Sequence, residues 1–577
     1  MNIQTPPSPP GDGIDEGKRL VRLGGDRGLS LAERLTDRFQ RLAWRTPIHR
    51  LALRGRYPLK LLAVADDPFM GDAARGNAML QGMLSYRGET LNIAGLSLDR
   101  PGFSRPFAEY VHSFAWLRDL STVAPRVTAA PIAESIMRQW LDAHAERVGD
   151  PAWRADQWGR RILFWVAHAP LILSSSDLIY RSRVLNTLAR GSRHLERVVD
   201  KAPAGLPRIA GWSGMVASLL MIPGGDGRRA GAEAGLERAL GASQFADGGV
   251  VSRSPDAQAE AIMLLTMLRA TYAARRLDAP GSLEQALVRM VAALIGLRHG
   301  DGGTGSWQGS APMDADALDQ IVAATGVRTR PLRQPRDWGY HSITAGTAAL
   351  ILDAAPPPVA RVVEGGCAST LAFELSDGPN RIIVNCGGAR GCHHSVAEML
   401  GEGLRTTAAH STLVIADSNS TAIHADGTLG RGVGEIELTR QEGDGSSRIE
   451  ASHDGYVRRF GFVHRRQLIL SAEGRDLRGE DMLLPRGRKR RGDTPFAVRF
   501  HLAPGIEVAP TADGQGAFLR VPGGALWQFR ARGAAMSVED SVWIDPRGRP
   551  HGTRQLVLSG ETPPGGTSVT WVLHRSR

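Results

Sequence analysis

The sequence predicts a two-part α+β protein, in which a helical array precedes an antiparallel β-sandwich. Two observations carry this prediction. From about residue 111 to residue 297, apolar residues recur at i, i+3 and i+4 in segments separated by Gly, Pro or Asp. Beyond about residue 340 the pattern changes to short apolar runs, and clusters of Gly, Asp and Asn separate these runs.

The helical part is expected to be a layered array or toroid, because serial helices joined by short loops pack as antiparallel neighbours. A short segment with β character, Met83–Phe107, precedes it. No sequence repeat of fixed period is visible, which disfavours a solenoid with a readable consensus. The expected helices are Val111–Asp119, Ala133–Arg147, Gly159–Ala169, Asp177–Val199, Ile209–Leu220, Ala232–Ala242, Pro255–Ala274 and Ser282–Leu297.

The C-terminal part is expected to contain many short strands. They are Thr347–Leu352, Thr370–Leu375, Ile382–Val384, Thr412–Ile415, Gly434–Thr439, Arg448–Ser452, Arg466–Ser471, Ala497–Leu502, Ala517–Val521, Leu526–Phe529, Gln555–Ser559 and Ser568–Leu573. We therefore divide the chain into a disordered tail (1–28), a helical domain (29–335) and a β-sandwich domain (336–577). Two segregated domains should meet at a cleft, where ligand sites tend to lie.

Length and charge narrow the class of protein. The chain has 577 residues, of which 42% are apolar and 22% charged, as in globular proteins with more than one core. Its formal net charge is +11, and Arg486–Arg491 is a dense basic run. Such a balance favours an anionic partner, namely an acidic polysaccharide, nucleic acid or a lipid surface, although a basic run is also typical of a solvated loop. No nucleic-acid-binding motif is visible, so no nucleic acid is expected.

The N-terminal region bears on location. It lacks the basic start and apolar core of a secretory signal, and no apolar run is long enough for a membrane span. We expect a cytoplasmic protein, unless the start codon is misassigned or export is unusual. The arginine-rich segment Leu29–Leu62 has helical spacing. It fits a helix packed on the main body, or one that makes peripheral contact with an anionic membrane.

The stretch Arg381–Ser420 concentrates titratable side chains. Between two apolar runs it holds two cysteines, His393, His394 and His410. With Cys367 the chain has three cysteines, so no disulfide framework is expected. The stretch is either a functional loop bounded by strands or a long polar excursion on the surface.

Four spaced motifs, together with the domain order, resemble the heparinase II/III-like proteins of bacteria. They are FADGGVVSRSP at Phe245–Pro255, AAHSTLVIADSNST at Ala408–Thr421, ASHDGYVRRFGFVHRR at Ala451–Arg466 and RGEDML at Arg478–Leu483. The resemblance implies an incomplete (α/α) toroid joined to a β-sandwich, and β-elimination on a uronic-acid polysaccharide. It also implies a frequently periplasmic location and, in some members, a structural zinc.

Several family positions differ in this sequence. The Asn-His dipeptide implied before one helix is replaced by residues that include Arg208, and the implied helical tyrosine is Ala257. In the β-domain, Gly365, Cys367 and Ser369 stand where the resemblance implies His, His and Asp. Asn385 replaces a further metal-ligating Asp, whereas His410 is kept.

Zinc accepts Cys and His readily, and Asn is a poor ligand. His410 and Cys367 could therefore join a zinc site completed by His393 or Cys392. Alternatively, His410 is a hydrogen-bonded structural residue. No cofactor is certain.

Seven residues are the candidates for chemistry. A lyase must neutralise a carboxylate, remove a proton and protonate a leaving oxygen, and His and Arg suit these tasks. The predicted catalytic residues are His410, Tyr340 and His299, and the predicted substrate-binding residues are Arg208, Arg253, Arg298 and His341. Structural readings stay open: His299 as a helix cap, Tyr340 on a β-edge and Arg208 in a salt bridge.

Two functions remain. The first is a lyase that acts by β-elimination on an anionic, uronic-acid-containing polysaccharide. The second is a catalytically degenerate relative that binds an anionic glycan or cell-envelope polymer without cleaving it. The oligomeric state is left open.

Overall fold

The computed structural model describes residues 18–22, 60–96, 102–359, 365–487 and 492–576, and residues 44, 46, 49, 53 and 98. Three sequence-based expectations fall largely outside these residues: most of the N-terminal tail, most of the Leu29–Leu62 helix with its membrane contact, and the centre of the Arg486–Arg491 basic run. Among the described helices, none combines the length and apolar character needed to cross a membrane.

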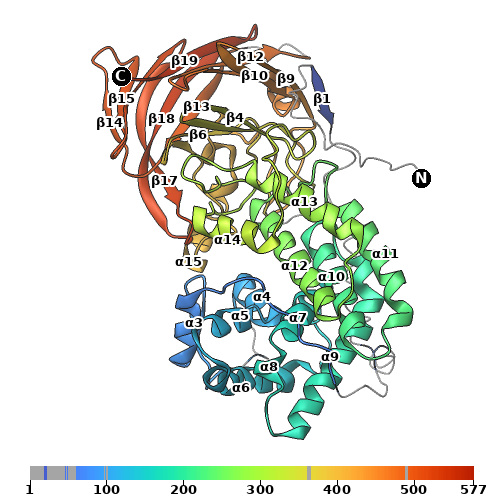
Figure 1. The fold of residues 1–577 in the computed structure, drawn as a ribbon. Helices are drawn as coiled ribbons and strands as arrows, with labels where there is room; N and C mark the ends of the chain where they lie inside the picture. The colour runs from blue at the N-terminus through green and yellow to red at the C-terminus, as the bar shows by residue number, and fades with distance from the viewer. Residues whose placement is uncertain are drawn as a thin grey trace, which may run out of the picture.

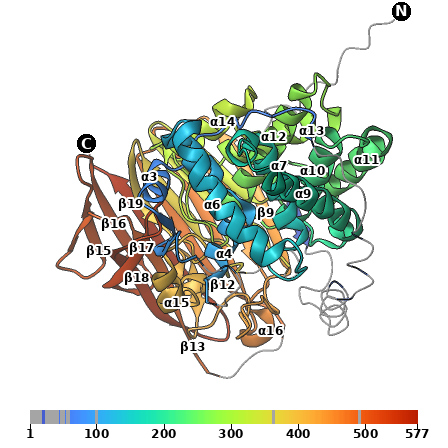
Figure 2. The ribbon, with the colours of Figure 1, turned by 90° about the horizontal axis from the view of Figure 1, so that it is seen from below.

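The predicted fold class is confirmed: a helical region precedes two antiparallel sheets (Figure 1). Seen from below, the helices stand in front of the sheets (Figure 2). The last helix of this region ends at Thr325, and the strand that follows it begins at Tyr340. The helices of this region are α3 (Ala73–Leu80), α4 (Arg105–Ser113), α5 (Trp116–Val123), α6 (Arg126–His144), α7 (Ala155–Ala167), α8 (Ala169–Ile172), α9 (Leu178–Val198), α10 (Leu206–Met221), α11 (Asp226–Ser243), α12 (Pro255–Ala274), α13 (Gly281–Ile295) and α14 (Ala315–Thr325).

Helix α10 lies at the centre of the helical region. Almost all of its side chains are buried, as expected for a helix that is apolar on all faces. It approaches α7 closely enough that a Cβ added to Gly159 would lie 1.9 Å from the carbonyl oxygen of Ala210. Glycine at this position is therefore required by the contact between the two helix backbones.

The larger sheet has nine strands in the order β1-β9-β10-β11-β12-β19-β16-β15-β14. The second has eight, in the order β17-β18-β13-β7-β6-β5-β4, with β8 paired to β13. Their facing sides share one apolar core. The strands are β1 (Arg19–Arg22), β4 (Tyr340–Ala345), β5 (Ala348–Asp353), β6 (Phe373–Asp377), β7 (Asn380–Val384), β8 (Leu413–Ile415), β9 (Glu435–Gly443), β10 (Ser446–His453), β11 (Phe462–Ser471), β12 (Asp476–Pro485), β13 (Thr494–Leu502), β14 (Glu507–Pro510), β15 (Gly516–Arg520), β16 (Leu526–Arg532), β17 (Ala535–Ile544), β18 (Pro550–Thr562) and β19 (Thr567–Arg575). A separate hairpin, β2 (Met83–Tyr86) and β3 (Glu89–Asn92), precedes α4.

One part of the expected disordered tail is ordered. Residues 19–22 form strand β1, which pairs antiparallel with β9, and Lys18 forms an ion pair with Glu437 at 2.9 Å. A free sheet edge offers unpaired backbone groups to any extended segment. The tail composition did not reveal this pairing, because the partner strand lies more than 400 residues away.

Candidate functional site

Arg253 and Tyr340, two predicted site residues, meet at the junction of the helical region and the sheets. Arg253 is 2% exposed and donates to a carboxylate oxygen of Asp353 on β5 at 2.5 Å and to the carbonyl of Trp338 at 2.8 Å. Its guanidinium lies over the Tyr340 ring, 4.6 Å from the centroid, and the Tyr340 hydroxyl donates to the Arg253 carbonyl at 2.7 Å. These contacts use both side chains to join the two parts of the chain.

His299 also lies at this junction. It follows α13, and its Nδ1 is 3.1 Å from the Ser376 hydroxyl while its Nε2 is 3.4 Å from Glu374, both on β6. Burial lowers the pKa of His299, and the neighbouring Arg381 lowers it further. The side chain is 3% exposed. It docks the loop after α13 onto the β-sandwich.

The remaining predicted binding residues are dispersed. His341 is buried, which lowers its pKa to about 3, with Arg440 as a further cause. Arg298 forms a surface ion pair with Asp319 at 2.6 Å. Arg208 donates to the carbonyl of Ala202 at 2.9 Å, near the start of α10. The structure does not gather these three side chains, so their role in substrate binding stays a prediction.

His410 and Cys367 do not fit the zinc site that the resemblance implies. His410 is buried and its Nδ1 donates to the Thr406 carbonyl at 2.7 Å. Burial raises the pKa of the Cys367 thiol to about 12, which disfavours the thiolate that binds zinc. Asn385 instead donates to Glu374 at 2.9 Å. In the described part of the chain, no three His, Cys, Asp or Glu side chains are grouped so as to hold a metal ion.

A different set of side chains converges at the junction, and we call it the junction cluster: Arg87, Arg105, Glu109, Asp256 and Arg390. Arg87 occupies the β2–β3 turn, Arg105 and Glu109 lie on α4, Asp256 lies in the first turn of α12, and Arg390 follows β7. Burial raises the pKa of Asp256 and lowers that of Arg390, and the charges of this set act on both groups as well. The cluster therefore joins helical residues to one loop of the sandwich.

The β2–β3 turn rests directly on that loop. The carbonyl of Arg87 accepts the backbone N–H of His394 at 3.0 Å, and the Arg87 guanidinium donates to the carbonyl of Arg390. Gly88 in the same turn has φ +82°, and a Cβ there would lie 3.1 Å from Nδ1 of His393. Glycine thus permits both the turn and its close approach to the loop.

The Arg390 guanidinium is a cation that has no ion-pair partner among the described residues. Its backbone N–H donates to Gly309 at 3.0 Å, and its aliphatic stem runs past Gly309 and Gly365. Within the described residues, its guanidinium has no ion pair or hydrogen bond, although its side chain reaches solvent. Surrounding protein removes part of its hydration and lowers its pKa; Asp256 and Glu109 oppose this shift, and Arg105 and Arg87 add to it.

The two acidic side chains near Arg390, Glu109 and Asp256, have other partners. Glu109 binds Arg154 at 3.0 Å and Arg105 at 3.1 Å. Burial raises the pKa of Asp256, against the attraction of Arg87 and Arg390, and its carboxylate accepts the N–H of Ala311 at 3.3 Å. The local balance leaves positive charge at Arg87 and Arg390, which suits a carboxylate or sulfate.

No local sequence pattern predicts this cluster. Arg87 and Arg390 are single arginines beside glycine in turns, a context shared by many surface arginines of the chain. Their proximity depends on a contact across some three hundred residues.

Comparisons with known proteins identify the C-terminal part. Residues 327–572 match the sequence profile described as heparinase II/III-like, C-terminal. This match shows that the C-terminal part carries a heparinase II/III-like domain. The family resemblance predicted from the motifs is thereby confirmed.

Similarity to individual proteins extends over most of the chain. FtsZ-localized protein C of Caulobacter vibrioides is 28% identical over 558 residues, 92% of each chain. Among solved structures, heparinase III has a TM-score of 0.68 at 12% identity, over 94% of this chain and 91% of that one. Heparan sulfate lyase HepC of Pedobacter heparinus has 0.58 at 14%, over 91% and 87%. At these low identities the structural similarity shows the fold alone. The helical region and the β-sandwich together have the same fold as these two lyases.

Proposed function

We propose that this protein binds an acidic polysaccharide at the junction cluster and does not cleave it. The observation that carries the proposal is the Arg390 guanidinium, exposed beside Arg87 and lacking a partner among the described residues. Planar guanidinium groups bind carboxylate and sulfate through paired hydrogen bonds. Two proteins of similar fold, a heparan sulfate lyase and a chondroitin AC lyase in complex with chondroitin sulphate, support an anionic glycan as the ligand class.

Absence of cleavage follows from the positions of the expected bases. A general base must come within hydrogen-bond reach of the proton that it removes. Tyr340, His299 and His410 are at most 3% exposed, and each has a partner inside the protein. The tyrosine position implied by the resemblance is Ala257, which is buried. The name of the Caulobacter relative describes an association with FtsZ and no reaction, which supports a binding role.

The second candidate function is that of a lyase. The raised pKa of Asp256 is the observation that favours it. Its pKa is raised by burial, which moves a carboxylate toward the range useful for proton transfer. Arg87 and Arg390 would neutralise the uronate carboxylate in such a reaction, and Asp256 would take the C5 proton. As the C4–C5 double bond forms and the C4–O bond breaks, the protonated Asp256 would return the proton to the leaving glycosidic oxygen. This candidate differs from the first in predicting an unsaturated product.

The two candidates are separated by one experiment. Heparin-like, alginate-like and bacterial exopolysaccharide substrates are incubated with the protein, while binding and the ultraviolet absorbance of unsaturated product are followed. Binding without a rise in absorbance supports the first candidate. Steady product formation by the wild type overturns it in favour of the lyase, and absence of binding to every polymer overturns both.

The cellular location of the protein and its contact with membranes are two further expectations. We propose a cytoplasmic location, which a fluorescent fusion would report, and contact of residues 29–62 with anionic vesicles is the alternative to packing of this segment on the main body. A fusion exported from the cytoplasm, or a truncation of residues 1–62 that sediments with vesicles as the full chain does, would contradict these expectations.

A further inference from the structure

The outer face of the nine-stranded sheet carries a hollow of about 470 Å³ that is separate from the junction cluster. It lies over β15, β16 and β19, on the sandwich far from the helices (Figure 1). Alternation along β16 sends Trp527, Phe529 and Ala531 into the core. The intervening residues, Gln528, Arg530 and Arg532, therefore project outward.

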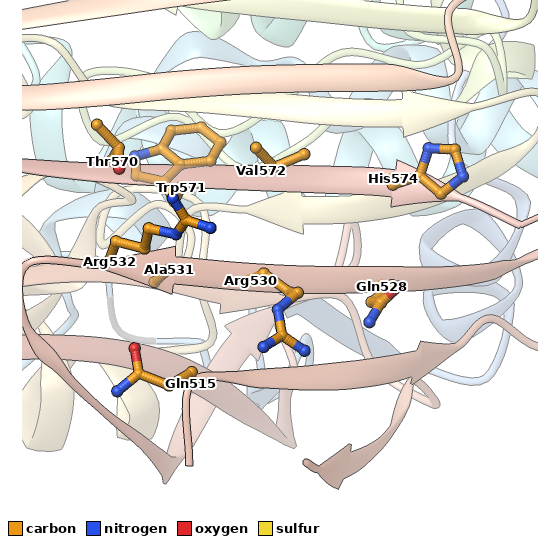
Figure 3. A pocket seen from close by; sticks show the side chains of 9 residues that line it. All are labelled: Gln515, Gln528, Arg530, Ala531, Arg532, Thr570, Trp571, Val572 and His574. Carbon is orange, nitrogen blue, oxygen red and sulfur yellow. The ribbon is translucent and has the colours of Figure 1, made fainter. Parts of the chain in front are cut away.

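The register of the strands explains the hollow. Arg530 pairs with Val572 on one side and with Gly516 on the other, and Arg532 pairs with Thr570. Gly516 contributes no side chain, while Val572 and Thr570 are short. Figure 3 shows the long side chains of Arg530 and Arg532 beside the short side chains of Val572 and Thr570 on the neighbouring strand. Long polar groups thus surround a shallow floor.

The positive charge around this floor is compensated in part by Asp513 and by Glu480 of β12, which lies across Thr570 from Arg532. Arg530 forms an ion pair with Asp513 at 2.6 Å, and the same Asp513 accepts the N–H of Gln515 at 3.1 Å. Arg532 has neither an ion pair nor a hydrogen bond from its side chain to any described residue, and the same is true of Arg478 on β12. Arg478 pairs with Val572 from the opposite side, so its Cα is about 10 Å from that of Arg530.

We propose that this hollow is a second ligand site, which takes an acidic sugar unit bearing a sulfate or carboxylate. Arg530 and Arg532 bind the anionic group. Gln515, Gln528 and Thr570 bind hydroxyl groups, because amide and hydroxyl side chains both donate and accept hydrogen bonds. The volume is on the scale of a small-ligand site, typically about 300–1,000 Å³, which favours one or two sugar rings over an acidic protein surface.

A sulfated hexasaccharide prepared from heparin is the probe, titrated by calorimetry at low salt. Arg530→Gln with Arg532→Gln is compared with Arg520→Gln, a control on the outer face of β15 that is 76% exposed. We expect the double variant to lose one bound oligosaccharide per chain, or to weaken that event at least about tenfold, since a charge-assisted hydrogen bond contributes a factor of this order. The control should retain wild-type binding, and all variants should keep the wild-type unfolding temperature.

Two results would overturn the second site. One is a double variant that binds the hexasaccharide as the wild type does. The other is equal or tighter binding of polyglutamate at the same residues, which would assign the hollow to an acidic peptide. Arg87→Gln with Arg390→Gln, titrated in parallel, reports on the junction cluster alone, so failure of either site is distinguished from failure of the other.

Discussion

Arg253 of the helical region and Asp353 of strand β5 form a buried ion pair that joins the two parts of the chain. The guanidinium lies 2.5 Å from one carboxylate oxygen, and the other carboxylate oxygen accepts the Ser369 hydroxyl at 2.7 Å. The sequence predicts a catalytic role for Tyr340 and a substrate-binding role for Arg253, and both side chains lie at this ion pair. Its contacts make it a structural connection between the domains.

Replacing Arg253 by Met should destabilise the protein by about 3–5 kcal/mol, because it leaves the Asp353 carboxylate buried without its cation. Urea unfolding measures this change. The double variant Arg253→Met with Asp353→Leu should recover much of the loss, since it removes both charges. The surface pair Arg228–Glu196 provides the control, and Arg228→Met should cost at most about 1 kcal/mol. Equal costs for the two single variants would contradict the structural role.

His341 should make stability depend on pH. Its pKa is lowered by burial from 6.5 to about 3, so the folded protein holds it neutral while the unfolded chain binds a proton below pH 6.5. Stability is therefore lost as pH falls from about 6.5 toward 3. Between pH 7 and pH 5 the wild type should lose about 2 kcal/mol more than His341→Leu. Parallel stability curves for the two proteins would refute this assignment.

Asp256→Asn should separate binding from catalysis. The substitution removes a negative charge that faces Arg87 and Arg390, so a binding protein should take an acidic oligosaccharide a few-fold more tightly. A lyase that used Asp256 as its base would lose product formation. Fluorescence titration and ultraviolet absorbance are read on the same samples. Weaker binding in the variant would show that Asp256 contacts the ligand favourably.

Metal analysis should find less than about 0.1 zinc per purified chain, because structural zinc needs about four ligands. His410 is hydrogen-bonded to the Thr406 carbonyl, and burial raises the pKa of the Cys367 thiol. Cys367→Ser should leave this content unchanged. One zinc per wild-type chain, lost in the Cys367→Ser variant, would be inconsistent with the geometry described above.

The fold followed from local patterns. Helices such as α12 and strands such as β11 leave a periodicity that can be read within ten to twenty residues, and the motifs added the family. Strand β1 was missed because its pairing with β9 is a long-range contact. The sequence does not show which polar residues are buried. Arg253 and His299 have side chains suited to a functional site, but in the structure they bind residues of the β-sandwich and join the two domains.

The junction cluster illustrates the same limit. Arg87 and Arg390 are separated by more than three hundred residues, and nothing in the local composition of either turn distinguishes it. Only the folded chain brings the two cations together beside Asp256.

The most direct test of the account is a calorimetric titration of wild type and Arg390→Gln with an acidic oligosaccharide, with Arg228→Gln as the charge-matched control. We predict that Arg390→Gln weakens binding at the junction at least about tenfold, that Arg228→Gln binds as the wild type does, and that no unsaturated product forms. Equal affinities for wild type and Arg390→Gln would contradict the proposal that the junction cluster holds the ligand.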